Sequence, residues 1–113
     1  MKQIIAIIRP VAVERVEHAL HELGHFPGLT LLRVKGESRG RGVGHAYKPV
    51  EWNIEEHDNV MVFLLCSDEL AARISNAISS AAHTGRPGDG VIAISEVSQV
   101  VRIGTDERGA AAV

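Results

Sequence analysis

The chain has 113 residues, of which 45% are hydrophobic and 23% charged, and its formal net charge at pH 7 is -2. This composition predicts one small globular domain, residues 1–113, and excludes the disordered and fibrous classes. It also argues against a general nucleic-acid binder, because no excess of basic side chains is present to neutralise a phosphate backbone. Its single cysteine excludes a disulfide framework, and no apolar run is long enough to insert into a membrane, so we expect a cytoplasmic protein.

The first part of the chain predicts a strand, a helix and a second strand. Residues 2–9 (KQIIAIIR) form a β-branched run that ends at Pro10, which cannot continue a sheet ladder. Over residues 11–24 the apolar side chains recur at spacings of three and four, which is typical of an amphipathic helix that a glycine ends. Residues 29–35 (LTLLRVK) predict the second strand.

The second part of the chain predicts a strand, a helix and a last strand after a long polar segment. Residues 38–58 form the polar segment, and residues 59–66 are a continuous apolar run that predicts a strand. A helix capped by a serine is expected over residues 67–82. The glycine-rich loop HTGRPGDG, residues 83–90, then leads into a strand that ends in VVRI, residues 100–103.

The order βαββαβ predicts an α+β, ferredoxin-like fold, in which two helices cover one face of a four-stranded antiparallel sheet. The first strand is apolar on both faces, since Ile4 and Ala6 point one way while Ile5 and Ile7 point the other. Two helices cannot cover both faces, and the second would expose more apolar area than a soluble monomer usually shows. We therefore expect an oligomer, and we expect the C-terminal GAAAV segment to be mobile.

The glycine-rich loop is the strongest functional signal in the chain. Glycines around one proline and one aspartate let backbone amides gather around an anion with no side chain in the way. Opposite the arginine of the VVRI segment, Arg102, the loop predicts a phosphate cradle and therefore a nucleotide site. Taken alone, the loop could equally be an ordinary turn.

The whole chain resembles the P-II family of nitrogen-regulatory signal-transduction proteins. The resemblance rests on IIAIIRP near the start, VKGESRGRG before the polar segment, TGRPGDG, and VVRIGTDERG near the end. It implies a homotrimer that binds ATP or ADP in clefts between subunits, with Mg²⁺ as a candidate cofactor. It also implies that the long segment, residues 38–58, is the T-loop that docks on a partner enzyme or membrane transporter. Such a protein regulates and is not an enzyme, although slow ATP hydrolysis stays open.

The resemblance also assigns nucleotide-binding residues by position. The residues expected against the adenine and ribose are Ile8, Gly28, Thr30, Gly36 and Leu65. Those expected around the phosphates are Arg39, Gly88, Asp89, Gly90 and Arg102, together with Thr84, Gly85 and Arg86 of the same loop.

Two positions depart from the family pattern at the expected phosphate site. Val91 stands where a lysine usually follows the glycine-rich loop, and Gly104 stands where a second arginine is usual. Each charge-assisted contact contributes about 1.5–3 kcal/mol, so a triphosphate should bind weakly unless Arg41, Arg86 or Lys48 substitutes. ADP, AMP or another nucleotide becomes a candidate ligand.

The T-loop departs further from the family pattern. Gly40 replaces the glutamine that helps to chelate magnesium and 2-oxoglutarate, so the sequence argues against sensing of 2-oxoglutarate. Trp52 replaces the tyrosine that some members have modified, and it lacks the hydroxyl. Because a tryptophan in a polar loop is a favoured interface anchor, we expect Tyr47, Glu51 and Trp52 to contact the partner.

Histidines support an alternative function. Glu14, His18, His21 and His25 fall on one stripe of the expected first helix, and imidazoles three or four residues apart can share a transition-metal ion. The alternative is therefore a CutA-like or P-II-like protein of metal homeostasis that uses surface histidines. A solvated polar helix face is the favoured interpretation of the same stripe.

Overall fold

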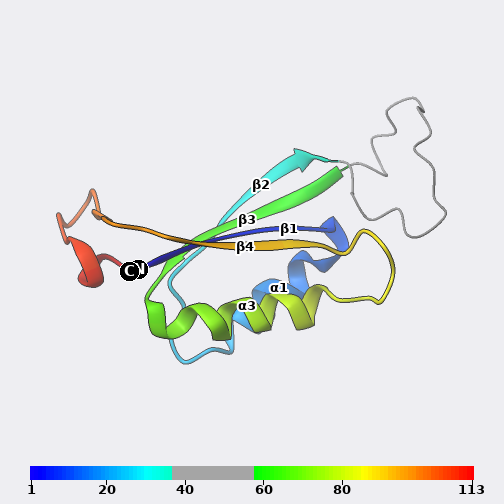
Figure 1. The fold of residues 1–113 in the computed structure, drawn as a ribbon, viewed down its shortest axis with the longest axis horizontal. Coiled ribbons are helices and arrows are strands. Elements are labelled where there is room, and N and C mark those ends of the chain that lie inside the picture. Colours follow the sequence, from blue (N-terminus) through cyan, green and yellow to red (C-terminus); the bar gives the residue numbers. More distant parts are fainter. Residues whose placement is uncertain (37–57) are drawn as a thin grey trace.

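Four antiparallel strands and two helices make up the part of the chain that the computed structural model describes, residues 1–36 and 58–113 (Figure 1). The sheet order is β2-β3-β1-β4. The strands are β1 (Lys2–Ile8), β2 (Thr30–Lys35), β3 (Asp58–Cys66) and β4 (Gly90–Glu96). The helices are α1 (Val13–His21) and α3 (Asp68–Ala82), with a short 3-10 turn, η1 (Pro10–Ala12), before the first. The predicted ferredoxin-like α+β fold is confirmed.

The hydrophobic core lies between the sheet and the two helices, which Figure 1 shows on the same side of the sheet. Along β1, Ile4, Ala6 and Ile8 are buried, whereas Ile5 and Ile7 between them are only half-buried. Successive side chains of a strand point to opposite faces, so this alternation identifies the helix-covered face. The helices contribute the buried residues Ala12, Val16, Leu20, Ala71, Ile74, Ile78 and Ala82.

The opposite face of the sheet is also apolar, as the sequence predicts. The register places Met61 of β3 and Val91 of β4 on either side of Ile7, so these three side chains share the face that points away from the helices. Val91 is 62% exposed and Leu32, which pairs with Met61, is 47% exposed. In a single chain this face keeps large apolar side chains in contact with solvent.

The helices begin and end close to the predicted positions, with one difference that bears on function. Ser67 is the N-cap residue of α3, as expected. The first helical segment is divided, because Pro10 opens the 3-10 turn and α1 ends at His21 instead of Gly24. The shorter helix leaves His25 outside α1, so the expected stripe of histidines is not continuous.

The prediction of a last strand that extends to Ile103 is wrong, because β4 ends at Glu96. The chain then folds back on itself: the Gly109 amide donates to the Val100 carbonyl oxygen at 2.9 Å. Asp106 adopts a left-handed conformation, with φ of 59°, which a strand does not allow.

The C-terminal segment is folded, which corrects the expectation that it is mobile. Residues Gly109–Ala112 form a second 3-10 turn, η2, in which Ala112 is only 2% exposed. The Arg102 guanidinium holds this turn, since its Nε donates to the carbonyl oxygen of Ala112 at 2.7 Å. Small side chains allow the segment to pack closely, a feature that composition alone does not reveal.

Substitution of Gly90 tests how closely the start of β4 approaches β1. Its φ is +123°, and a side-chain Cβ there would overlap the carbonyl oxygen of Ile7 on the neighbouring strand. We expect Gly90→Ala to lower the free energy of unfolding by about 1–3 kcal/mol, measured by urea denaturation. Gly104→Ala is the matched control, because a Cβ at Gly104 meets no atom within 4 Å. Equal stability of the two variants would contradict the described approach of β4 to β1.

Candidate functional site

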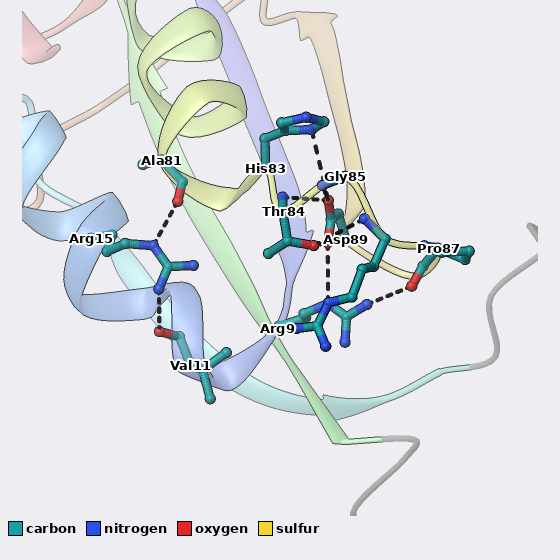
Figure 2. Close-up of polar contacts among 10 residues, drawn as sticks. Arg9, Val11, Arg15, Ala81, His83, Thr84, Gly85, Pro87 and Asp89 are labelled. Atoms are coloured by element: carbon teal, nitrogen blue, oxygen red, sulfur yellow. Dashed lines mark hydrogen bonds and ion pairs between the residues drawn. The ribbon is translucent and has the colours of Figure 1, made fainter.

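The glycine-rich loop is folded around the carboxylate of Asp89 (Figure 2). Asp89 Oδ2 accepts hydrogen bonds from the backbone amides of Thr84, at 2.7 Å, and Gly85, at 3.1 Å. Asp89 Oδ1 accepts a third hydrogen bond from the Thr84 hydroxyl, whose oxygen in turn accepts one from the Arg86 amide at 3.2 Å. The loop is therefore an ordered turn, and Asp89 is its central acceptor.

Arg9 connects this turn to the end of β1. Its Nε donates to Asp89 Oδ1 at 3.2 Å, and its Nη2 donates to the carbonyl oxygen of Pro87. Figure 2 shows the Arg9 side chain reaching across to the loop. The sequence motifs do not indicate this role of Arg9. The signal that could have found it is a basic residue at the end of an apolar strand, directly before a proline.

Arg15 fixes the helix from which the loop departs. Its Nε donates to the carbonyl oxygen of Ala81, in the last turn of α3, at 2.9 Å, and its Nη1 donates to the Val11 carbonyl oxygen at 3.3 Å. An arginine is favourable at this end of a helix because the last carbonyl groups lack intrahelical partners. The start of the glycine-rich loop is thus held by α1 as well as by β1.

The loop hydrogen bonds keep Asp89 ionised. They hold the pKa of Asp89 far below its ordinary value, chiefly through the Thr84 hydroxyl and the Thr84 amide, with smaller contributions from the Gly85 amide and Arg9. His83 Nδ1 lies 3.8 Å from Asp89 Oδ2 on the other side. Asp89 therefore closes the turn as a carboxylate at any physiological pH.

Two backbone amides of the loop remain available to a ligand. Within residues 1–36 and 58–113, the amides of Gly88 and Asp89 donate no hydrogen bond to the protein. Gly88 is exposed and has a φ of +90°, a conformation that a glycine adopts without strain. Adjacent amides without partners on an ordered turn can donate to one anion.

The predicted site residues fall into two groups in the folded chain. The first group, the loop group, gathers at one end of the sheet: Ile8, Gly36, Thr84, Gly85, Arg86, Gly88, Asp89 and Gly90. A hollow of about 320 Å³ opens there, and Ile8, Asp89, Gly90 and Val91 are part of its lining. The apolar side chains of Ile78 and Ile92 contribute to the same hollow, which lies between α3 and β4.

The second group, the arginine group, consists of Gly28, Thr30, Leu65 and Arg102. All four line one hollow of about 290 Å³, together with Phe63 and the C-terminal turn residue Ala112. The chain brings these residues together from the start of β2, the end of β3 and the segment after β4. The sequence does not predict that these residues come together, because the strand expected to contain Arg102 ends at Glu96.

The two groups lie at opposite ends of the sheet. Leu65 pairs with Gln3 near the start of β1, whereas Gly90 pairs with Ile8 at its end. Each strand residue advances about 3.4 Å, so these positions lie about 17 Å apart along β1. The glycine-rich loop and the C-terminal segment leave the sheet at its two ends in Figure 1. One chain therefore does not place the loop against Arg102.

The predicted partner and sensor residues lie outside the described part of the chain. These residues are Arg39, Tyr47, Glu51 and Trp52, and the cations Arg41 and Lys48 lie there too. Their roles stay predictions.

Two histidines of the proposed metal site, His18 and His21, contact other side chains. His18 Nε2 pairs with Glu22 Oε1 at 2.9 Å, and the ring of His21 lies 4.0 Å, centroid to centroid, from the ring of Phe26. Across the described ranges no three side chains of the ligating types come together in a way that could hold a metal ion. The metal-binding alternative, with His18, His21 and His25 as ligands, gains no support.

The fold and loop together define a ferredoxin-like α+β protein with an ordered glycine-rich turn between its second helix and an edge strand. The family model described as nitrogen regulatory protein P-II matches residues 1–107. This chain belongs to the P-II family, as its sequence motifs predict.

Individual relatives match the chain over its full length. It is 41% identical to nitrogen regulatory protein P-II of Azospirillum brasilense over 113 residues, covering 100% of both chains. The identity to nitrogen regulatory protein P-II of Rhizobium meliloti is 40%, and to nitrogen regulatory protein GlnK of Escherichia coli 34%, again with 100% of each chain covered. The relatives carry regulatory names, in agreement with the expected class of protein. No helix within the described ranges is long and apolar enough to cross a membrane.

The hydrogen bonds of Asp89 predict how the thermal stability of the protein changes in acid. Because the folded-state pKa of Asp89 is lowered, its stabilising effect is complete above the ordinary value of 3.8 and is lost as the pH falls below it. Asp89→Asn should therefore unfold at a lower temperature than the unaltered protein at neutral pH, and the difference should shrink in acid.

The matched control is Asp106→Asn, which removes an exposed carboxylate that pairs with Arg108. Exposed pairs contribute little, so this change should leave the melting temperature nearly unaltered. A difference for Asp89→Asn that stays constant from neutral to strongly acidic pH would contradict the role of the ionised carboxylate. Differential scanning calorimetry over a pH series measures both.

Proposed function

We propose that this protein is a homotrimeric signal-transduction regulator that binds ATP or ADP in clefts between its subunits. Nucleotide occupancy is read out by the T-loop, residues 38–58, which regulates a partner enzyme or membrane transporter. The regulatory names of the relatives support nitrogen status as the signal. The observation that carries the proposal is the ordered loop with the Gly88 and Asp89 amides unpaired within the described chain.

The division of the site supports a cleft between subunits. A nucleotide that contacts both the loop group and the arginine group needs the loop end of one sheet beside the arginine end of another. The apolar face that carries Met61, Leu32 and Val91 supplies a surface through which copies can associate. Association through this face would remove apolar area from water and complete the site in the same step.

The chemistry of each group suits a different part of the nucleotide. The hollow of the arginine group has apolar walls from Phe63 and Leu65, which suit a purine base, and Thr30 offers a hydroxyl to its edge. The amides of the loop group suit phosphate oxygens, and Arg102 supplies a permanent positive charge across the cleft. Mg²⁺ would assist by neutralising the phosphates, while Gly40 argues against 2-oxoglutarate.

Regulation would follow from a shift between T-loop conformations. Arg39 lies near the start of this segment and would contact the phosphates, so bound nucleotide can favour one conformation of residues 38–58. Tyr47, Glu51 and Trp52 would then contact the partner.

Mixed trimers test the shared cleft. Gly88→Leu should disable the loop group and Arg102→Ala the arginine group, so neither variant alone should bind ATP in isothermal titration calorimetry. After co-expression in equal amounts, about one cleft in four should combine an intact loop with an intact Arg102, and binding should reappear at that stoichiometry.

Light scattering on the same samples gives the oligomeric state. A trimeric mixture that shows no recovered binding would contradict a site shared between subunits. A monomeric protein, or an unaltered protein that gives no heat with ATP or ADP, would overturn the proposed function as a whole.

A further inference from the structure

Arg9 contacts three consecutive residues of the glycine-rich loop. It donates to the Pro87 carbonyl oxygen and to Asp89 Oδ1, and its Nη2 lies against Gly88, where an added Cβ would be only 3.2 Å away. The Arg9 and Asp89 side chains are 29% and 20% exposed, so the pair is more shielded from water than the other side-chain ion pairs of the described chain. These contacts involve residues 87–89, the part of the loop that contains the Gly88 and Asp89 amides.

The backbone of Arg9 is fixed on both sides. Arg9 follows the last residue of β1, and its carbonyl oxygen accepts a hydrogen bond from the Ala12 amide at 3.0 Å, within η1. Pro10 holds the chain in the extended conformation before it, with φ of -68° and ψ of 144° at Arg9. The guanidinium therefore extends from a rigid base, which is what a residue that positions a loop requires.

Arg9 offsets the negative charge of Asp89 beside the loop amides. A carboxylate beside the amides of Gly88 and Asp89 would repel a phosphate that approaches them. The guanidinium, 3.2 Å from Asp89 Oδ1, offsets this charge while the carboxylate keeps its hydrogen bonds to Thr84 and Gly85. A lysine could supply the charge, but it has one nitrogen and could not reach the carboxylate and the Pro87 carbonyl in the same fork geometry.

We propose that Arg9 is a positioning residue for the phosphates, which holds the glycine-rich loop in its anion-receptive conformation through Asp89 and Pro87. This inference rests on the proposed nucleotide site and adds a residue to it. Arg9 acts on the loop, and the loop amides act on the phosphates. Three of the residues expected against the base and ribose, Gly28, Thr30 and Leu65, line the hollow of the arginine group, at the opposite end of the sheet from Arg9.

The test compares ATP with adenosine, which lacks phosphates. Arg9→Gln should weaken ATP by about tenfold or more in isothermal titration calorimetry, as expected for the loss of one charge-assisted contact. Adenosine affinity should change by less than about twofold, because no phosphate is present to be positioned. Arg9→Lys should recover only part of the ATP affinity.

Hydrogen exchange gives a readout that requires no ligand. The Thr84 and Gly85 amides should exchange faster in Arg9→Gln, since Asp89 loses its link to β1. Arg73→Gln, on the exposed side of α3, is the matched control for the loss of one positive charge, and it should alter neither nucleotide affinity nor exchange in the loop. Light scattering and melting curves establish that each variant keeps the fold and assembly.

The outcomes separate the two proposals. If the unaltered protein binds ATP and Arg9→Gln binds it equally well, or loses adenosine to the same extent as ATP, the assignment of Arg9 is overturned alone. Full recovery by Arg9→Lys would show that only the charge matters and would also overturn the positioning role. An unaltered protein that binds neither ligand overturns the nucleotide site and the role of Arg9 with it.

Discussion

The ion pair between Arg9 and Asp89 links the end of β1 to the glycine-rich loop, and the arrangement of the candidate site depends on it. Asp89 organises the turn by accepting the amides of Thr84 and Gly85, and Arg9 ties that carboxylate to the central strand of the sheet. Three glycines in eight residues give the loop no tendency to hold one conformation by itself, because glycine loses more backbone entropy on ordering than any other residue. The charged pair and its hydrogen bonds supply the order that the composition lacks.

The sheet keeps the loop group and the arginine group apart, whereas the ion pair organises the loop group. Its central strands place the loop group and the arginine group at opposite ends, about 17 Å apart along β1. The same sheet exposes an apolar face that a second copy can cover. In the proposed trimer, assembly and ligand binding would both depend on this face, and a change that weakens subunit contact is expected to weaken nucleotide binding too. Coupling between assembly and nucleotide binding suits a regulator, because a ligand in a shared cleft contacts both subunits and can change the conformation of each.

Much of the fold is readable from local pattern. The alternation of Ile4, Ile5, Ala6 and Ile7 predicts a two-faced strand, and the structure shows the same alternation in burial. The apolar run after Asp58 and the helix that begins after Ser67 are local signals of the same kind. What the sequence did not show depends on contacts between distant segments. The turn after Glu96 forms because residues 97–113 fold back on themselves, and the link from Arg9 to Asp89 joins positions 80 residues apart.

The site follows the same rule. The sequence shows the glycine-rich loop as a motif. It does not show that the Asp89 carboxylate holds the turn while the Gly88 and Asp89 amides remain available. The expected stripe of histidines is interrupted for a local reason, since α1 ends at His21 and His25 lies beyond it.

The proposed function requires that one nucleotide is held between the glycine-rich loop of one subunit and Arg102 of the next. The most direct measurement is a crystal structure of the full chain with ADP. We expect a trimer with ADP in each cleft, its phosphates on the Gly88 and Asp89 amides and its base in the hollow beside Leu65. ADP bound entirely within one subunit, or at a cleft that contains neither the loop nor Arg102, would contradict it.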